Sequence, residues 1–381
     1  MSPDSHIRAG QTTLSDSIAA VRAFHCAVHQ TQMALVVFFC SRSHDLDVVA
    51  REMARLFGTV PVVGCTSAGE IGPVGYTEHA LSGFSLGQRA FQTAVGCIED
   101  VRGVDLPEGR QFVADLQQRL HAQSHHSKAS NHFALMLIDG LTMREERVTR
   151  AIQTALGHVP LLGGSAADGM DFQRTEVYAN GQFGTGRAVV LLIATALPVQ
   201  SFKIQHFVPT AQRLVVTEAD APNRLVKEIN GRPAAQAYAD LIGVDIGALD
   251  ATQFAAAPLM VLIDGSAYIR SIQKANPDGS LTFFCAIEEG MVLRVARGCD
   301  LLGNMRQSFN DIRHAIGEPL LTIAFDCILR KLENIRTGCA DEVADVFRAN
   351  RAVGLNTYGE QYCGVHVTQT LTGVAIGAPR G

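Results

Sequence analysis

The chain has 381 residues, of which 47% are hydrophobic and 18% are charged, and its formal net charge is -5. This length predicts two domains, and the apolar content excludes a disordered chain. The slightly acidic balance offers no basic field that would collect nucleic acid or anionic lipid, so we expect neither as a partner.

The nine cysteines are scattered and form no CxxC pair. Most lie in apolar runs such as VVFFC (36–40), so we expect buried thiols of a reducing compartment, without a zinc cluster or a secreted disulfide frame. The N-terminus lacks a basic region followed by an apolar one, and no run reaches the roughly 18 apolar residues that span a bilayer. The sequence therefore predicts a cytoplasmic protein without membrane attachment.

The first 30 residues are predicted to form a polar arm with one helix, capped by Asp16 or Ser17. The apolar run MALVVFFC (33–40) then predicts a strand, and Ser43 is a candidate cap for the following helix. A second strand and a turn of small residues follow in VPVVGCTSAGE (60–70), before two further strands. The order of this unit is β-α-β-turn-β-β.

The same order recurs about 100 residues later, with the strand FALMLID (133–139), a helix from Thr142 and the segment VPLLGGSAADG (159–169). This self-similarity predicts that a domain spanning 31–215 is built from a duplicated β-α-β-β unit. Asp139 and Asp264 each end an apolar strand, where small ligands often bind in α/β folds, although aspartates are also common turn formers.

A second domain is predicted over 216–381, after one continuous strand, FKIQHFVPT (202–210). Its end repeats the strand, helix and strand order in LLTIAFDCI (320–328) and VGLNTYGE (353–360). The expected fold class is α/β (α+β mixed), with two domains of mixed β-sheets flanked by helices.

The stretch 354–377 combines a Gly-rich turn with β-branched residues and contains one histidine, His366. Glycine lets a backbone approach a ligand closely, and a β-strand fixes the directions of its side chains. His366, with the nearby Tyr358, Glu360 and Tyr362, therefore predicts a ligand-holding edge.

Two groups of motifs carry a family resemblance. VPVVGCTSAGEIG (60–72) and ALSGFSL (80–86) resemble the FIST N domain, while FDCILRKLE (325–333), TYGEQ (357–361) and HVTQTLTGVAIG (366–377) resemble the FIST C domain. The resemblance covers roughly 31–377. The ending also resembles the stand-alone haem-binding branch of that family, NosP. This resemblance implies a sensor without catalytic activity that binds haem b and takes up nitric oxide. It also implies that the protein regulates a partner histidine kinase and thereby influences cyclic-di-GMP signalling, biofilm behaviour or quorum sensing.

In that interpretation His366 is the axial iron ligand, because an imidazole oriented by a nearby acceptor holds haem iron well. Arg330 is the candidate donor to a propionate, since a guanidinium matches a carboxylate bidentately. Both residues also have a structural alternative: His366 a hydrogen bond within a strand edge, and Arg330 a surface ion pair. The reserve candidates are His206 and His314 for iron, Cys363 and Cys327 as thiolate ligands, and Arg306 for a propionate.

An alternative is a FIST module that binds a small metabolite, such as an amino acid, without haem. The two small-residue turns at 64–70 and 163–169 are then expected to pack tightly or to line a ligand cleft. An enzyme is not expected, because no P-loop or GxSxG elbow occurs, and Ser67 or Cys65 would need a base, for which Glu70 is the only neighbour in sequence. The sequence is compatible with a homo-oligomer.

Overall fold

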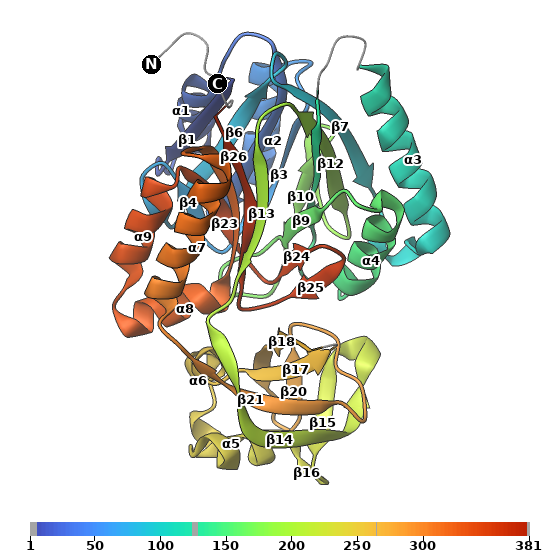
Figure 1. The fold of residues 1–381 in the computed structure, drawn as a ribbon, viewed down its shortest axis with the longest axis vertical. Helices are drawn as coiled ribbons and strands as arrows, with labels where there is room; N and C mark the ends of the chain where they lie inside the picture. The colour runs from blue at the N-terminus through green and yellow to red at the C-terminus, as the bar shows by residue number, and fades with distance from the viewer. Residues whose placement is uncertain (1–5, 124–128, 264, 379–381) are drawn as a thin grey trace.

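The computed structural model describes residues 6–123, 129–263 and 265–378. The protein has a mixed α/β architecture with a large body and a smaller inserted domain (Figure 1), which confirms the predicted fold class. The body is built from three segments of the chain: 7–87, 91–195, and 199–204 together with 301–377. The inserted domain spans 207–298 and divides the third segment.

The three segments have the same order of elements: an edge strand, a helix, a strand, one or two helices, a strand, a hairpin and a closing strand. The first segment contains β1 (Ile7–Thr12), α1 (Ser17–Val28), β2 (Met33–Ser41), α2 (Leu46–Phe57), β3 (Val62–Ser67), β4 (Glu70–Gly72), β5 (Gly75–Thr77) and β6 (Leu81–Gly87). The second contains β7 (Phe91–Ile98), η1 (Val101–Gly103), α3 (Leu106–Ala122), β8 (Asn131–Ile138), α4 (Glu145–Leu156), β9 (Leu161–Ser165), β10 (Val177–Ala179), β11 (Gln182–Gly184) and β12 (Ala188–Thr195). The third contains β13 (Val199–Ile204), α7 (Leu301–Ile316), β22 (Pro319–Cys327), α8 (Ile328–Thr337), α9 (Ala340–Ala349), β23 (Ala352–Thr357), β24 (Glu360–Tyr362), β25 (Val365–Val367) and β26 (Leu371–Gly377).

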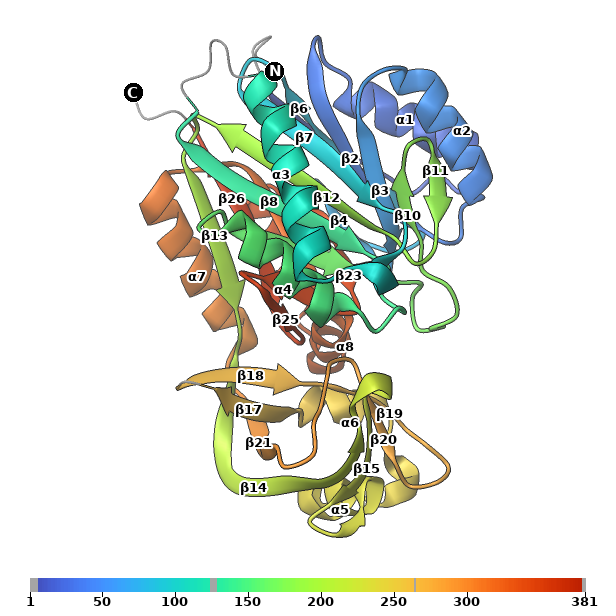
Figure 2. The same ribbon diagram turned by 90° about the vertical axis from the view of Figure 1, so that its right-hand side faces the viewer.

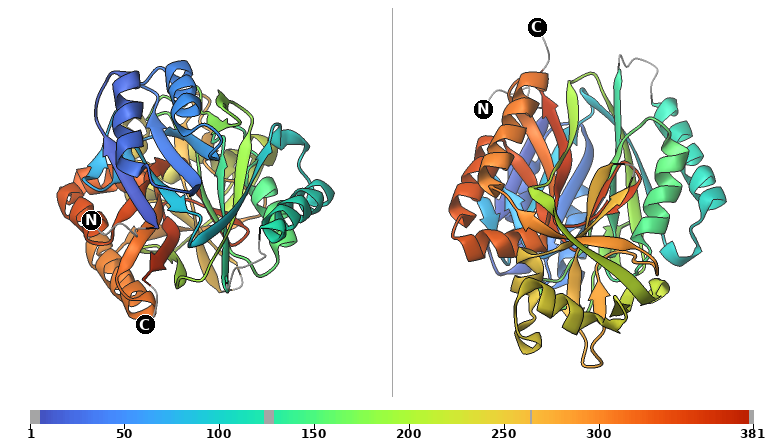
Figure 3. Two further views of the ribbon diagram at one scale, coloured as in Figure 1. Left: turned by 90° about the horizontal axis from the view of Figure 1, so that it is seen from above. Right: turned by 60° about the horizontal axis from the view of Figure 1, so that its bottom comes forward.

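Each segment gives its hairpin to the sheet of another segment. The three six-stranded sheets have the orders β1-β6-β2-β3-β10-β11, β7-β12-β8-β9-β24-β25 and β13-β26-β22-β23-β4-β5. The exchange is cyclic. The hairpin of the first segment extends the sheet of the third, that of the second extends the sheet of the first, and that of the third extends the sheet of the second. Seen from above, the three sectors surround a common centre with strands inside and helices outside (Figure 3, left).

The inner faces of the three sheets meet in one apolar core. Alternate residues of β2, such as Val37 and Phe39, point into it, while Val36 and Phe38 pack against α1 and α2. The same alternation occurs in β8 and β22. Because both faces of these central strands are buried, their sequences are continuous apolar runs rather than alternating ones.

The inserted domain contains β14 (Phe207–Asp220), η2 (Ala221–Asn223), β15 (Leu225–Ile229), β16 (Arg232–Pro233), α5 (Ala234–Ile242), η3 (Ile246–Ala248), α6 (Ala251–Ala256), β17 (Leu259–Ile263), β18 (Ser266–Arg270), β19 (Ile272–Ala275), β20 (Leu281–Phe283) and β21 (Val292–Gly298). It lies below the body, where the long strand β14 curves away from β13 (Figure 2). Buried and partly buried polar contacts join the two parts. Arg224 donates to Glu145 at 2.7 Å and to Glu146 at 2.5 Å, and Gln369 donates to the carbonyl of Ala255 at 2.8 Å.

Several predicted boundaries differ from the structure. The single strand predicted over 202–210 is wrong, since β13 ends at Ile204 and β14 begins at Phe207, where the chain leaves the body. The boundary predicted between 215 and 216 lies inside β14, and β13 pairs with the C-terminal strand β26. Ser43 does not cap α2, because the Asp45 side chain accepts from the Val48 amide at 3.0 Å.

The nine cysteines are free thiols, but they are not uniformly buried as predicted. Cys40, Cys65, Cys285 and Cys327 are buried, whereas Cys26, Cys299 and Cys363 are exposed. Within the described residues, no helix is both long and apolar enough to cross a membrane. Asp264 lies outside the described residues.

Candidate functional site

The turns that follow β3, β9 and β23 meet at the centre of the body. A backbone amide of each turn donates to a carbonyl at the end of the β3, β9 or β23 strand of another segment, so the three bonds close into a cycle, which we name the central ring. These bonds run from Ala68 N to Asn356 O (3.0 Å), from Ala167 N to Thr66 O (3.0 Å) and from Tyr358 N to Ser165 O (3.4 Å).

A cavity of about 670 Å³ lies beside the central ring. Its volume falls in the range of small-molecule sites. Its walls come from all three segments: the turn 67–69 and the loop 41–43 of the first, the loop 168–174 of the second, and α8 of the third. The predicted small-residue turns therefore do line a cavity.

Lys331 on α8 is the best-defined charged group of this cavity. Its Nζ lies 2.9 Å from the Ala68 carbonyl oxygen and 2.8 Å from Glu78 Oε1, and its side chain is 14% exposed. An ammonium has three N–H donors, so one remains for a ligand. Gly69, with φ +138°, makes this approach possible, because a Cβ there would lie 2.7 Å from the Lys331 Nζ.

Asn356 lies directly behind this turn. Its side chain is fully buried, and Nδ2 donates to the carbonyl and Oδ2 of Asp326, both at 3.3 Å. A carboxylate and a carbonyl accept only, so the amide is oriented with Oδ1 toward Gly69. A Cβ on Gly69 would lie 2.7 Å from this Oδ1, which has no hydrogen-bond partner in residues 6–123, 129–263 and 265–378.

The opposite wall is a loop found only in the second segment. In the other two segments, two residues join the strand to the hairpin (68–69 and 358–359), whereas 166–176 make this connection here. Asp168 holds the loop, since its carboxylate accepts from the amides of Phe172 (3.0 Å), Gln173 (2.8 Å) and Arg174 (2.7 Å). The Tyr358 hydroxyl donates to the same carboxylate.

One wall of the cavity is apolar. Ile328, Leu332 and Ile335 follow one another along the face of α8 that carries Lys331. Met170 lines the cavity from the loop. Ile335 is 56% exposed and Met170 is 44% exposed, so apolar surface at the rim is left in contact with solvent.

The remaining lining carries charges of both signs. The cations are Lys331, Arg42 and Arg174, and the anions are Glu78, Asp168 and Asp171. Both arginines also pair with Glu176, at 3.7 and 2.8 Å. The cavity therefore offers separate donors and acceptors rather than a field of one sign.

Two buried glutamates occupy equivalent places in the first and third segments. Glu70 accepts from the Ser67 hydroxyl and from the Ala80 amide, and Glu360 accepts from the hydroxyls of Thr357 (2.5 Å) and Thr370 (2.7 Å). Burial raises the pKa of Glu70 to about 7 and the pKa of Glu360 to about 8. Glu360 thus holds the turn from within the core and does not line the cavity.

His366 lies in β25, away from the cavity lining. It is 3% exposed, its Nδ1 lies 3.4 Å from Gln361 Nε2, and its Nε2 has no hydrogen-bond partner within the described part of the chain. Burial lowers the pKa of His366, while Glu146 and Glu145 act in the opposite direction. The ring packs on Gly359, where a Cβ would lie 2.7 Å from Nε2.

The other predicted site residues do not gather around His366. The Tyr358 ring stacks on Phe172 with centroids 4.6 Å apart, at the central ring. Tyr362 instead lies near Lys203, whose Nζ is 5.8 Å from its ring centroid. Arg330 is buried in an ion pair with Asp326, at 2.7 Å.

The reserve candidates are dispersed as well. His206 is buried beside Arg330, His314 lies on the surface of α7, and Cys327 is buried at the start of α8. Asp139 accepts from the Leu141 amide at 3.0 Å and acts as a turn former, its structural alternative. The sequence alone does not point to Lys331, although the residue lies inside the FDCILRKLE motif. Lys331 and the turn 67–69 are remote in sequence and come together only in the folded chain.

The buried glutamates predict how stability depends on pH. Each carboxyl has a folded pKa above its ordinary value of 4.5, so between these values the folded state binds a proton that the unfolded state has lost, and stability falls as pH rises. Glutamine mimics the protonated acid and does not titrate, so Glu360→Gln removes one of these two carboxyls from the pH dependence of stability. Denaturant unfolding gives the free energy of unfolding of both proteins. The value for Glu360→Gln minus the value for the natural protein should rise by about 1.4 kcal/mol per pH unit between about pH 5 and 8.

Glu342→Gln on the exposed face of α9 is the matched control and should follow the natural protein. Parallel curves for Glu360→Gln and the natural protein would show that Glu360 is ionised in the folded state throughout this range.

Comparisons with known proteins identify the family. The sequence profile of the FIST N domain matches residues 34–232, and that of the FIST C domain matches residues 234–363. No curated protein matches the sequence. Among solved structures, the chain is similar to a cyanuric acid hydrolase from A. caulinodans, with 11% identity and a TM-score of 0.34 over 98% of this chain and 99% of that chain. The FIST N match alone spans more than half of the 381 residues, and the chain belongs to the FIST family, whose domains are sensory modules in signal transduction.

Proposed function

We propose that this chain senses a small zwitterionic metabolite, such as an amino acid, which binds in the cavity beside the central ring. The observation that carries the proposal is the Lys331 ammonium, held at the cavity wall by Ala68 and Glu78 with one donor left over. A ligand carboxylate is the natural partner for that donor, because charge-assisted hydrogen bonds are the stronger ones.

The other end of a zwitterion needs acceptors. Glu78 and Asp171 supply carboxylates to the same cavity, and the Ser67 hydroxyl and the loop backbone surround them. A ligand with only one sign of charge would face an unfavourable group at one end, whereas a zwitterion would match both. The wall formed by Ile328, Leu332 and Ile335 favours a ligand that also carries an apolar group.

The proposal includes no catalytic step. The Ser67 hydroxyl donates to Glu70, and burial raises the pKa of the Cys65 thiol, which is the opposite of what a nucleophile requires. In a sensor without an enzymatic activity of its own, the signal passes to a partner. We propose a histidine kinase in the cytoplasm for that role.

Amino acids should stabilise the protein. In a thermal-shift screen of the standard L-amino acids, a ligand at 100 times its Kd adds about 2.7 kcal/mol to the free energy of unfolding. Lys331→Met should abolish the shift, because it removes the ammonium and keeps the length of the side chain. Arg336→Gln, exposed on the same helix, is the control and should retain it. Shifts of equal size in the natural protein and in Lys331→Met would refute the assignment of the site.

A second candidate function is haem-based nitric oxide sensing of the NosP type, with regulation of a histidine kinase. The observation in its favour is the buried Nε2 of His366, which has no hydrogen-bond partner among the residues that the structure describes and which a metal would use. The surroundings fit a porphyrin poorly, because Gly359 packs on that edge of the ring and because Arg330 is already committed to Asp326. Haem binding through His366 would therefore require the β24–β25 hairpin to move.

The absorption spectrum decides between the two candidates. If haem is the ligand, the protein supplied with haem should show a Soret band that moves on addition of nitric oxide and is lost in His366→Ala. His314→Ala, at an exposed position on α7, should keep the band. A protein that takes up no haem would eliminate this second function and leave the metabolite proposal intact.

A further inference from the structure

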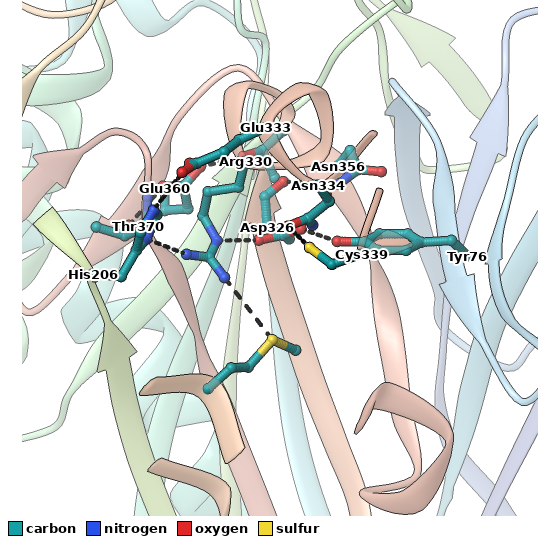
Figure 4. A network of polar contacts seen from close by, with 12 residues as sticks. Tyr76, His206, Asp326, Arg330, Glu333, Asn334, Cys339, Asn356, Glu360 and Thr370 are labelled. Atoms are coloured by element: carbon teal, nitrogen blue, oxygen red, sulfur yellow. Dashed lines mark hydrogen bonds and ion pairs between the residues drawn. The ribbon is translucent and has the colours of Figure 1, made fainter. Parts of the chain in front are cut away.

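Helix α8 contacts the cavity with one face and a buried polar network with the other. One face lines the cavity with Lys331 and three apolar residues. The other carries Arg330 and Glu333, which lie in a buried polar network (Figure 4). Lys331 is adjacent to Arg330 in sequence, so a rigid shift of the helix displaces both faces together.

The buried network is continuous. Arg330 donates from Nε to Asp326 Oδ1 at 2.7 Å, and its Nη1 lies 3.1 Å from His206 Nδ1. His206 Nε2 lies 2.9 Å from Glu333 Oε2. Because a guanidinium only donates, Nδ1 must accept, which leaves the proton on Nε2 to be donated to Glu333.

His206 belongs to the link between the body and the inserted domain. It lies between β13 and β14, where the chain enters that domain, and its carbonyl accepts from the Cys299 amide at 2.8 Å, where the chain returns. The segments 204–207 and 298–301 therefore run together, and we name them the crossing. The network fixes the crossing to α8.

The network also reaches the central ring. The Tyr76 hydroxyl of the first segment donates to Asp326, and Asn356 donates to the same residue. Since Asn356 lies behind Gly69, the Asp326 carboxylate is connected through Asn356 to the turn that lines the cavity, and directly to Arg330. Removing one member of a buried charged network leaves an uncompensated group, so its members tend to keep their contacts and move as a unit.

We propose that α8 and this network link the state of the cavity to the position of the inserted domain. A ligand that draws Lys331 toward itself shifts α8, and Arg330 and Glu333 transmit the shift to His206 and the crossing. The ligand arm of this proposal rests on the proposed function, but the mechanical link between Lys331 and His206 is a property of the chain itself. Linkage makes the effect reciprocal, so the crossing also influences the cavity.

Hydrogen exchange of the 381-residue chain without ligand tests the link in both directions. Lys331→Met should accelerate exchange severalfold at the crossing, and Glu333→Gln should do the same at the turn 66–70. Arg336→Gln is the control on the same helix, and peptides from β8 report any global loss of stability. An effect of Lys331→Met confined to 66–70 and 78, with the crossing unchanged relative to β8, would overturn the proposal.

The same samples separate this inference from the proposed function. If amino acids shift the melting temperature of the natural protein, exchange at the crossing should change on adding the standard L-amino acid mixture, and Glu333→Gln should weaken that response. Failure of amino acids to bind would overturn the ligand assignment, while the ligand-free exchange result would still decide whether α8 links the two places.

Discussion

The central ring is the constraint on which the body depends. Three backbone hydrogen bonds tie the turns after β3, β9 and β23 into a cycle, and each segment adds its hairpin to the sheet of another. No segment can complete its sheet alone, so the apolar inner faces can be buried only when all three are present. The ring also places turns that are distant in the sequence at one point.

Departures from this threefold plan create the cavity. In the second segment, the longer connection 166–176 replaces a two-residue turn and stands over the centre. In the third segment, α8 starts directly after β22, which directs Lys331 and its apolar neighbours toward the turn of the first segment. Helix α8 lies between the region where we place the ligand and the crossing. The inserted domain also reaches the loop 166–176 directly, because the ring centroids of Phe284 and Phe172 lie 5.8 Å apart.

Much of the fold can be predicted from the sequence, because local patterns determine it. The apolar runs at 33–40 and 133–139 correctly indicate central strands, since strands covered on both faces have no polar alternation. The inserted domain could not be predicted in this way. Strand-forming residues continue on both sides of Gln205 and His206, and only the three-dimensional path shows that the chain changes sheets there. Lys331 was missed for the same reason, since its partners Ala68 and Glu78 are remote in sequence.

The two groups on which the candidate functions depend, His366 and Lys331, lie in different surroundings. His366 is buried against Gly359 and lies outside the cavity lining, whereas Lys331 lines the cavity. A crystal structure of the protein grown with the amino acid that binds most tightly tests this account most directly. We predict ligand density with its carboxylate at the Lys331 Nζ and its apolar group against Ile328 and Ile335 on α8. Density at His366, or an empty cavity beside a ligand bound elsewhere, would contradict it.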